Sequence, residues 1–71
     1  MILEIGELDQ QELDELARVA NQYHVNVGEG IYSPILEGSE TDILRVTLDM
    51  WSMARDEWEE NGFNVMDGGI E

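Results

Sequence analysis

The amino-acid sequence predicts a single small α+β domain that spans residues 1–71. Two stretches carry apolar residues at helical spacing behind a capping residue, and short segments with β-branched residues lie beside them. The length allows one hydrophobic core, which is only marginally large enough. A small all-α domain with extended termini is the alternative. The expected elements are helices over about 10–23 and 40–61 and two or three short strands from 1–5, 25–32 and 63–66.

The first strand and the first helix are indicated by local signals. Residues 1–5, MILEI, are apolar and partly β-branched, and Gly6 ends them. Asp9 and Glu12 have the spacing of a capping box, which places a helix start just after Asp9. The apolar residues that follow at helical intervals, and that carry the helix to about residue 23, are Leu13, Leu16, Ala17, Ala20 and Tyr23.

The middle of the chain changes character after the first helix. Val25 and Val27 alternate with Asn26, which predicts a short strand within 25–32. The stretch GEGIYSPILEG then carries three of the seven glycines and the only proline, so it predicts an ordered loop. Its apolar residues indicate that the loop folds back on the core, and these are Ile31, Tyr32, Ile35 and Leu36.

The second helix is predicted to be long. Ser39 and Asp42 form an N-cap pair, and the apolar face continues without a Gly or Pro until residue 61, so the helix measures roughly 30 Å. Residues 63–66 alternate as a strand would, and the last five residues, DGGIE, predict a frayed tail. The residues of the apolar face are Ile43, Leu44, Thr47, Leu48, Trp51, Ala54 and Trp58.

Charge is the strongest signal in the sequence. Seventeen acidic residues face three arginines, Arg18, Arg45 and Arg55, with no lysine, so the formal net charge is -14. Such a chain repels nucleic acid and anionic membranes but attracts basic proteins. The sequence has no apolar run long enough for a membrane span and no basic leader, which predicts a soluble cytoplasmic protein, in the host cytoplasm if it is viral.

Catalytic and metal-binding patterns are lacking in the sequence. The chain has no cysteine, its only histidine, His24, follows a helix end, and its serines lie in no nucleophile motif. Gly28-Glu29-Gly30 fits a turn better than a phosphate loop, because a carboxylate stands inside it. Residues 67–70 resemble a fragment of a calcium loop whose register would place apolar residues at ligand positions. We expect no enzymatic activity, no cofactor and no metal site.

The acids of the long predicted helix form a pattern of their own. Asp42, Asp49 and Asp56 recur every seven residues, so on a continuous helix they lie close to one line. In ARDEWEENG, residues 54–62, acids crowd the expected helix end, where each carboxylate costs roughly 0.3–1 kcal/mol. That cost suggests a use for the charge. The candidate partner-binding residues are Asp42, Asp49, Asp56, Glu57, Glu59, Glu60 and Trp58.

These features predict a non-enzymatic acidic binding protein. The line of carboxylates along its long helix would imitate a nucleic-acid backbone and occupy a basic surface. An apolar or aromatic side chain would anchor the complex. In size and charge the chain resembles, in general character only, the acidic inhibitors that phages direct at host defence or transcription machinery. The candidates for the anchor are Tyr32, Trp51, Trp58, Met50, Met53 and Met66, although residues of these types belong more often to the core.

The acidity is also compatible with two alternative roles. The absence of lysine suits a halophilic protein, whose excess acids maintain hydration in concentrated salt. An apolar helix face could instead serve a structural or antitoxin-like module that forms a homodimer or covers a basic toxin. For the inhibitor, the expected partner is a basic protein surface, such as that of a nucleic-acid-binding enzyme.

Overall fold

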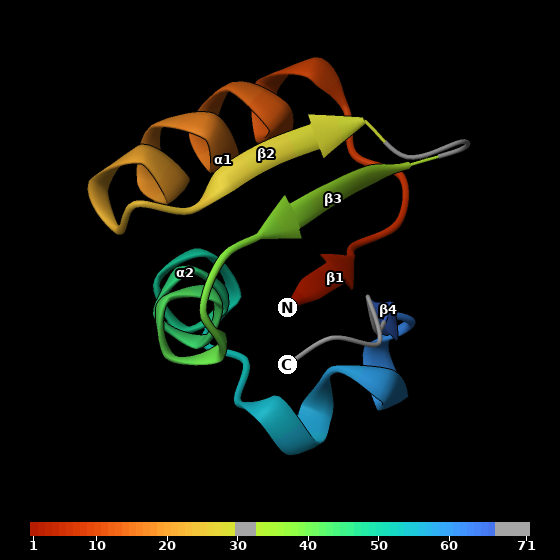
Figure 1. Ribbon diagram of the computed structural model, residues 1–71. Coiled ribbons are helices and arrows are strands. Elements are labelled where there is room, and N and C mark those ends of the chain that lie inside the picture. The colour runs from red at the N-terminus through yellow and green to blue at the C-terminus, as the bar shows by residue number, and fades with distance from the viewer. Residues whose placement is uncertain (30–32, 67–71) are drawn as a thin grey trace.

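The computed structural model describes residues 1–29 and 33–66, and it shows an antiparallel four-stranded sheet with the order β2-β3-β1-β4 (Figure 1). Together with the helices, this sheet confirms the α+β class. The elements are β1 (Ile2–Glu4), α1 (Gln10–Gln22), β2 (Asn26–Glu29), β3 (Pro34–Glu37), α2 (Glu40–Trp51), the 3₁₀ turns η1 (Arg55–Glu57) and η2 (Glu59–Asn61), and β4 (Asn64–Met66).

The elements with local signals lie where the sequence places them. β1, α1 and β4 fall within the predicted ranges 1–5, 10–23 and 63–66. The capping box of α1 forms as expected, because the Glu12 amide donates to Asp9 Oδ1 at 2.8 Å and the Asp9 amide donates to Glu12 Oε1 at 3.4 Å. α1 ends in a Schellman motif in which the Val25 amide donates to the Ala20 carbonyl at 2.9 Å.

The middle segment contains one strand more than the sequence predicts. Residues 25–32 were expected to hold a strand followed by a loop, but Pro34–Glu37 form the further strand β3, which pairs with both β2 and β1. Proline is compatible with this strand because it occupies the first position. Leu36 is fully buried opposite Leu3, so burial converts the expected loop into a central strand. Ile31 and Tyr32 lie outside the described residues.

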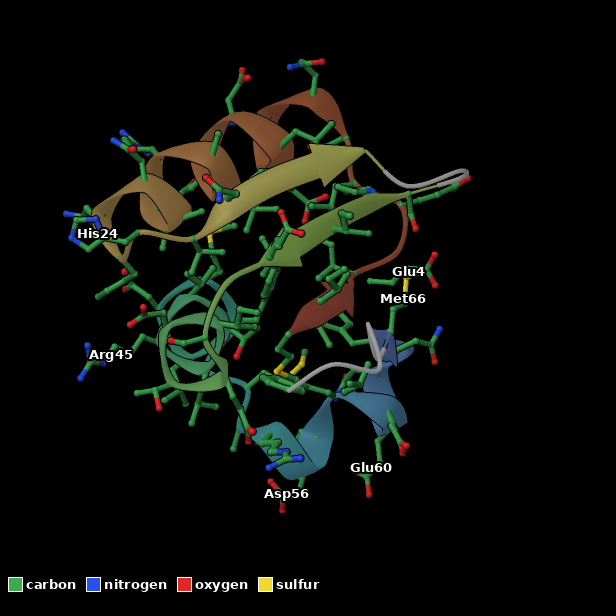
Figure 2. All side chains as sticks on the ribbon, viewed as in Figure 1. Glu4, His24, Arg45, Asp56, Glu60 and Met66 are labelled. Atoms are coloured by element: carbon green, nitrogen blue, oxygen red, sulfur yellow. The ribbon has the colours of Figure 1, made fainter. Side chains whose placement is uncertain are left out.

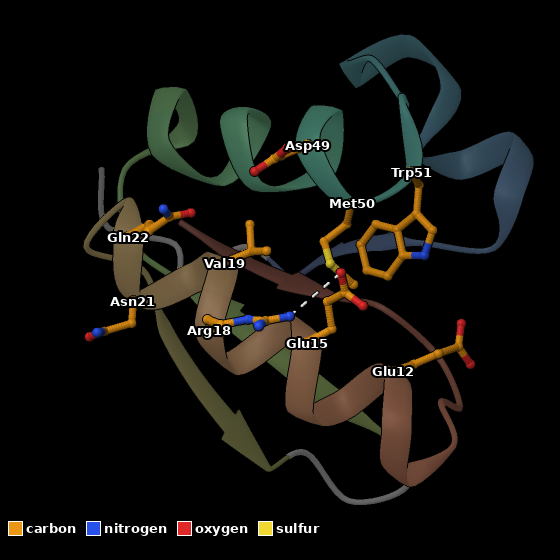
Figure 3. A pocket seen from close by; sticks show the side chains of 9 residues that line it. All are labelled: Glu12, Glu15, Arg18, Val19, Asn21, Gln22, Asp49, Met50 and Trp51. Atoms are coloured by element: carbon orange, nitrogen blue, oxygen red, sulfur yellow. Dashed lines mark ion pairs between the residues drawn. The ribbon is translucent and has the colours of Figure 1, made fainter.

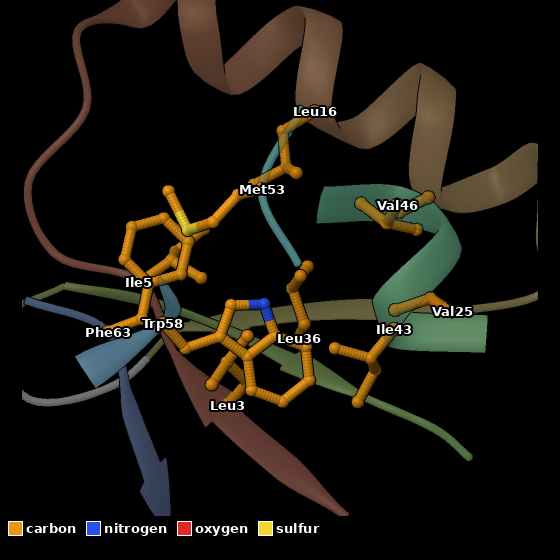
Figure 4. Close-up of a cluster of buried hydrophobic side chains, with 11 residues drawn as sticks. Leu3, Ile5, Leu16, Val25, Leu36, Ile43, Val46, Met53, Trp58 and Phe63 are labelled. Atoms are coloured by element: carbon orange, nitrogen blue, oxygen red, sulfur yellow. The ribbon is translucent and has the colours of Figure 1, made fainter. Parts of the chain in front are cut away.

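The prediction of one helix over 40–61 is wrong. α2 ends at Trp51, and Ser52 adopts a left-handed conformation with φ of 55°, while its amide donates to the Leu48 carbonyl at 3.0 Å. The chain then turns and continues as η1 and η2, so Met53 and Trp58 are buried in the core (Figure 4). The burial of these side chains outweighs the helical propensity of the segment.

A buried polar contact holds this turn against α2. The Trp58 indole, 1% exposed, donates from Nε1 to Thr47 Oγ1 at 3.0 Å. The same hydroxyl lies 3.0 Å from the carbonyl oxygens of Leu44 and Met53, to which it can donate. Thr47 is fully buried and is the only polar residue among the buried side chains that the structure describes. One hydroxyl therefore joins α2, the turn at Met53 and the Trp58 side chain between η1 and η2.

Candidate functional site

The acidic segment Arg55–Asn61 has a different local structure from the helix end that its sequence suggests. Asp56 and Glu57 lie in the first turn of η1, and Glu59 and Glu60 in the first turn of η2. Glu57 has a defined structural role, because the Ala54 amide donates to its Oε1 at 2.9 Å. Acids in a first turn are favoured by the exposed backbone amides, so the expected conflict with the dipole of a long helix does not arise.

The acids predicted to lie along one helix, Asp42, Asp49 and Asp56, fall into two separate groups in the structure. Asp42 lies in the first turn of α2, with its Oδ1 3.7 Å from Arg45 Nη1. Asp49 lies in the last turn of α2, where its Oδ2 is 3.5 Å from the Tyr23 hydroxyl of the α1 end. The turn at Ser52 then redirects the chain before Asp56, so the heptad spacing no longer produces one line. Figure 2 shows Asp56 and Glu60 projecting from the η segment, that is Arg55–Asn61 with η1 and η2, apart from both helices.

An open groove beside the η segment brings together part of the predicted site. Asp56 and Glu59 line it with the apolar side chains of Leu44 and Val65, the latter 45% exposed. Trp58 also borders the groove, but its near-complete burial and its hydrogen bond to Thr47 make it a core residue. The prediction of Trp58 as a partner-binding anchor is therefore corrected, because little of the indole is available for contact.

A second groove, of about 680 Å³, lies between α1 and α2 (Figure 3). Trp51, Met50 and Val19 supply half-buried apolar surface, and the Trp51 ring packs edge-to-face on Phe63 with centroids 5.3 Å apart. The acids that line it are Glu12, Glu15 and Asp49.

The sequence predicted Asp49 as a site residue, and Trp51 and Met50 as possible anchors, but Glu12 and Glu15 were missed. Their spacing of three residues on one helix face indicated that they lie together. The residues opposite that face are determined by the packing of α1 against α2. The spacing of residues in the sequence does not predict this packing.

The three arginines are all engaged in contacts within the chain. Arg18 Nη2 lies 3.8 Å from Glu15 Oε2, Arg45 pairs with Asp42, and Arg55 pairs with Glu40 across the start of α2. The arginine side chains are mostly exposed, so each pair contributes little to stability. Their importance is electrostatic, because the cations already neutralise particular acids and leave most of the negative charge uncompensated.

The structure also bears on metal binding and on membrane insertion. Within residues 1–29 and 33–66, no group of three or more His, Asp and Glu side chains is arranged to hold a metal ion. The helices of the same described residues are too short and too polar to cross a bilayer.

Comparison of the chain with protein-family models, with curated proteins and with solved structures finds no match. The function must therefore be inferred from the charge, the grooves and the exposed side chains.

Proposed function

We propose that this chain is a non-enzymatic acidic binding protein that occupies a basic nucleic-acid-binding surface, as an inhibitor of phage type directed at a host defence or nucleic-acid-handling enzyme. The observation that carries the proposal is a net charge of -14 in a domain whose three arginines are all paired internally. Such a charge distribution favours a basic partner at long range and disfavours direct binding to nucleic acid.

The acidic residues increase the association rate and the selectivity of binding, and apolar contacts decrease the dissociation rate. Carboxylates at Asp56, Glu59 and Glu60 are exposed and are free of hydrogen bonds to other described side chains, so they can meet cations without first breaking an internal contact. Steering by such charges accelerates encounter, while desolvated apolar side chains slow dissociation. Val65 lines the same groove as Asp56 and Glu59 and provides apolar surface.

The test reverses the charge at Asp49, Asp56, Glu59 and Glu60 by substitution with lysine. Glu57 is left unchanged because its side chain accepts the Ala54 amide. The wild-type protein and the variant are immobilised and exposed to a lysate of the source cell at about 50 mM and about 500 mM salt. Each captured protein is then purified and assayed for binding to a labelled DNA duplex.

The expected result is a nucleic-acid-binding protein that the wild type captures at low salt, and that it displaces from the duplex. The variant should capture it much less, while near-UV circular dichroism of the buried Trp58 confirms that the variant is folded. Capture that is equal for both chains and insensitive to salt would contradict the proposal, as would partners whose nucleic-acid binding is unaffected.

A further inference from the structure

The groove between α1 and α2 combines an aromatic end with acidic walls. Figure 3 shows the Trp51 indole at one end beside Met50, with Glu12 and Glu15 on the α1 wall and Asp49 on the α2 wall. Trp51 and Met50 are half-buried, so each presents some apolar surface to the groove while it is held by the core. The edge-to-face contact with Phe63 fixes the indole further.

The charges of this groove are unbalanced. Arg18 is the one cation among the described residues that line it, and this side chain faces Glu15 at 3.8 Å. Glu12 contacts the Asp9 amide and Asp49 contacts the Tyr23 hydroxyl. Neither carboxylate forms an ion pair among the described residues. The groove therefore presents two carboxylates, Glu12 and Asp49, with which a cationic side chain of another molecule can pair.

We propose that this groove binds an arginine side chain of the basic partner, and this inference rests on the proposed function. A guanidinium can stack on the Trp51 indole and donate to carboxylates from its edge at the same time. The ammonium of lysine is a compact, strongly hydrated charge that matches the combination less well. A second copy of the chain is a poor occupant, because each copy carries a charge of -14 and its arginines are already paired.

The test is an NMR titration of the whole protein with a hexa-arginine peptide and, separately, a hexa-lysine peptide at equal ionic strength. The two tryptophans give separate indole N–H signals, of which Trp58 is a built-in control because it is buried and bonded to Thr47. The Trp51 signal should shift with hexa-arginine while the Trp58 signal stays. Hexa-lysine should bind roughly fivefold more weakly.

Two charge-matched double variants locate the binding. Glu12→Gln with Asp49→Asn removes the uncompensated groove acids, and both replacements keep the acceptor that contacts Asp9 or Tyr23. Glu59→Gln with Glu60→Gln makes the same change of charge on η2. The groove variant should weaken hexa-arginine binding roughly fivefold, as for two exposed charge pairs, and the η2 variant about twofold or less.

Equal weakening in both variants, or an unmoved Trp51 signal, would overturn the groove assignment. That result would leave the proposed function standing as diffuse attraction of a basic surface. Failure of the proposed function looks different, because the capture experiment would then yield the same proteins with wild type and the charge-reversed variant at both salt concentrations.

Discussion

The Thr47 hydroxyl is a shared hydrogen-bonding partner for several buried groups in this small core. Its oxygen receives the Trp58 indole N–H and lies within donating distance of the Met53 carbonyl, with all three residues buried. A buried donor or acceptor that loses its partner costs about 1–3 kcal/mol. In a small domain that is a large part of the total stability.

Thr47→Val is therefore expected to lower the free energy of unfolding by about 1–3 kcal/mol, because the Trp58 N–H and the Met53 carbonyl lose their shared partner. Valine keeps the side-chain shape, so the loss isolates the hydroxyl. Urea denaturation measures the change. Thr41→Val, at an exposed position on the same helix, is the matched control and should change stability by less than about 0.5 kcal/mol. Equal effects at the two positions would refute the role of the Thr47 hydroxyl.

At the scale of elements, the two main helices are followed by residues with the same unusual backbone conformation. His24 after α1 and Ser52 after α2 both have left-handed backbones, with φ of 60° and 55°. Glycine is the usual residue in this conformation because side chains strain it. Both positions are exposed, so the chain ends each helix without the most favourable residue.

Ser52→Gly should raise the free energy of unfolding by about 0.5–1 kcal/mol, since relief of the left-handed strain exceeds the extra entropy of glycine in the unfolded chain. Thermal and urea denaturation measure it. The reciprocal change is Gly62→Ala, where φ is 86° and an added Cβ meets no atom within 4 Å, so only backbone strain acts. That variant should lose about 1 kcal/mol. A destabilised Ser52→Gly would show that the turn requires the serine itself.

Elements with signals in neighbouring residues were predictable, and those fixed by distant contacts were not. The pair Asp9 and Glu12 sufficed to place the start of α1. By contrast, β3 forms because Leu36 meets Leu3 across the sheet, and α2 stops at Trp51 because Trp58 must reach Thr47. The candidate site follows the same rule. Its acids were named individually, but the placement of Asp49 in one groove and of Asp56 and Glu59 in the other depends on the turn at Ser52.

At the scale of the whole molecule, repulsion between the acidic side chains dominates the electrostatic free energy of the folded state. The acids among residues 1–29 and 33–66 lie on a domain with a radius of gyration of 10.9 Å, within a few Debye lengths of one another at moderate salt. Folding concentrates this charge, so the folded state is penalised more than the extended chain.

Raising NaCl from about 10 mM to about 300 mM should therefore raise the melting temperature, by roughly 5 °C if screening recovers about 1 kcal/mol. Calorimetry at each salt concentration measures the shift. The Glu59→Gln with Glu60→Gln variant carries less charge and should show a smaller dependence on salt. Unfolding at low salt, with folding restored only near molar salt, would instead support the halophilic alternative.

The place of β1 in the sheet has a consequence for the order of assembly. β1 lies between β3 and β4, and Glu4 Oε1 accepts from Asn64 Nδ2 across 60 residues of sequence. The chain closed by β4 is nearly twice as long as the one closed by β3, which adds only about 0.6 kcal/mol of loop entropy. During synthesis, however, one edge of β1 stays without its β4 partner until residues 64–66 have left the ribosome. The first strand made is thus the last to be enclosed.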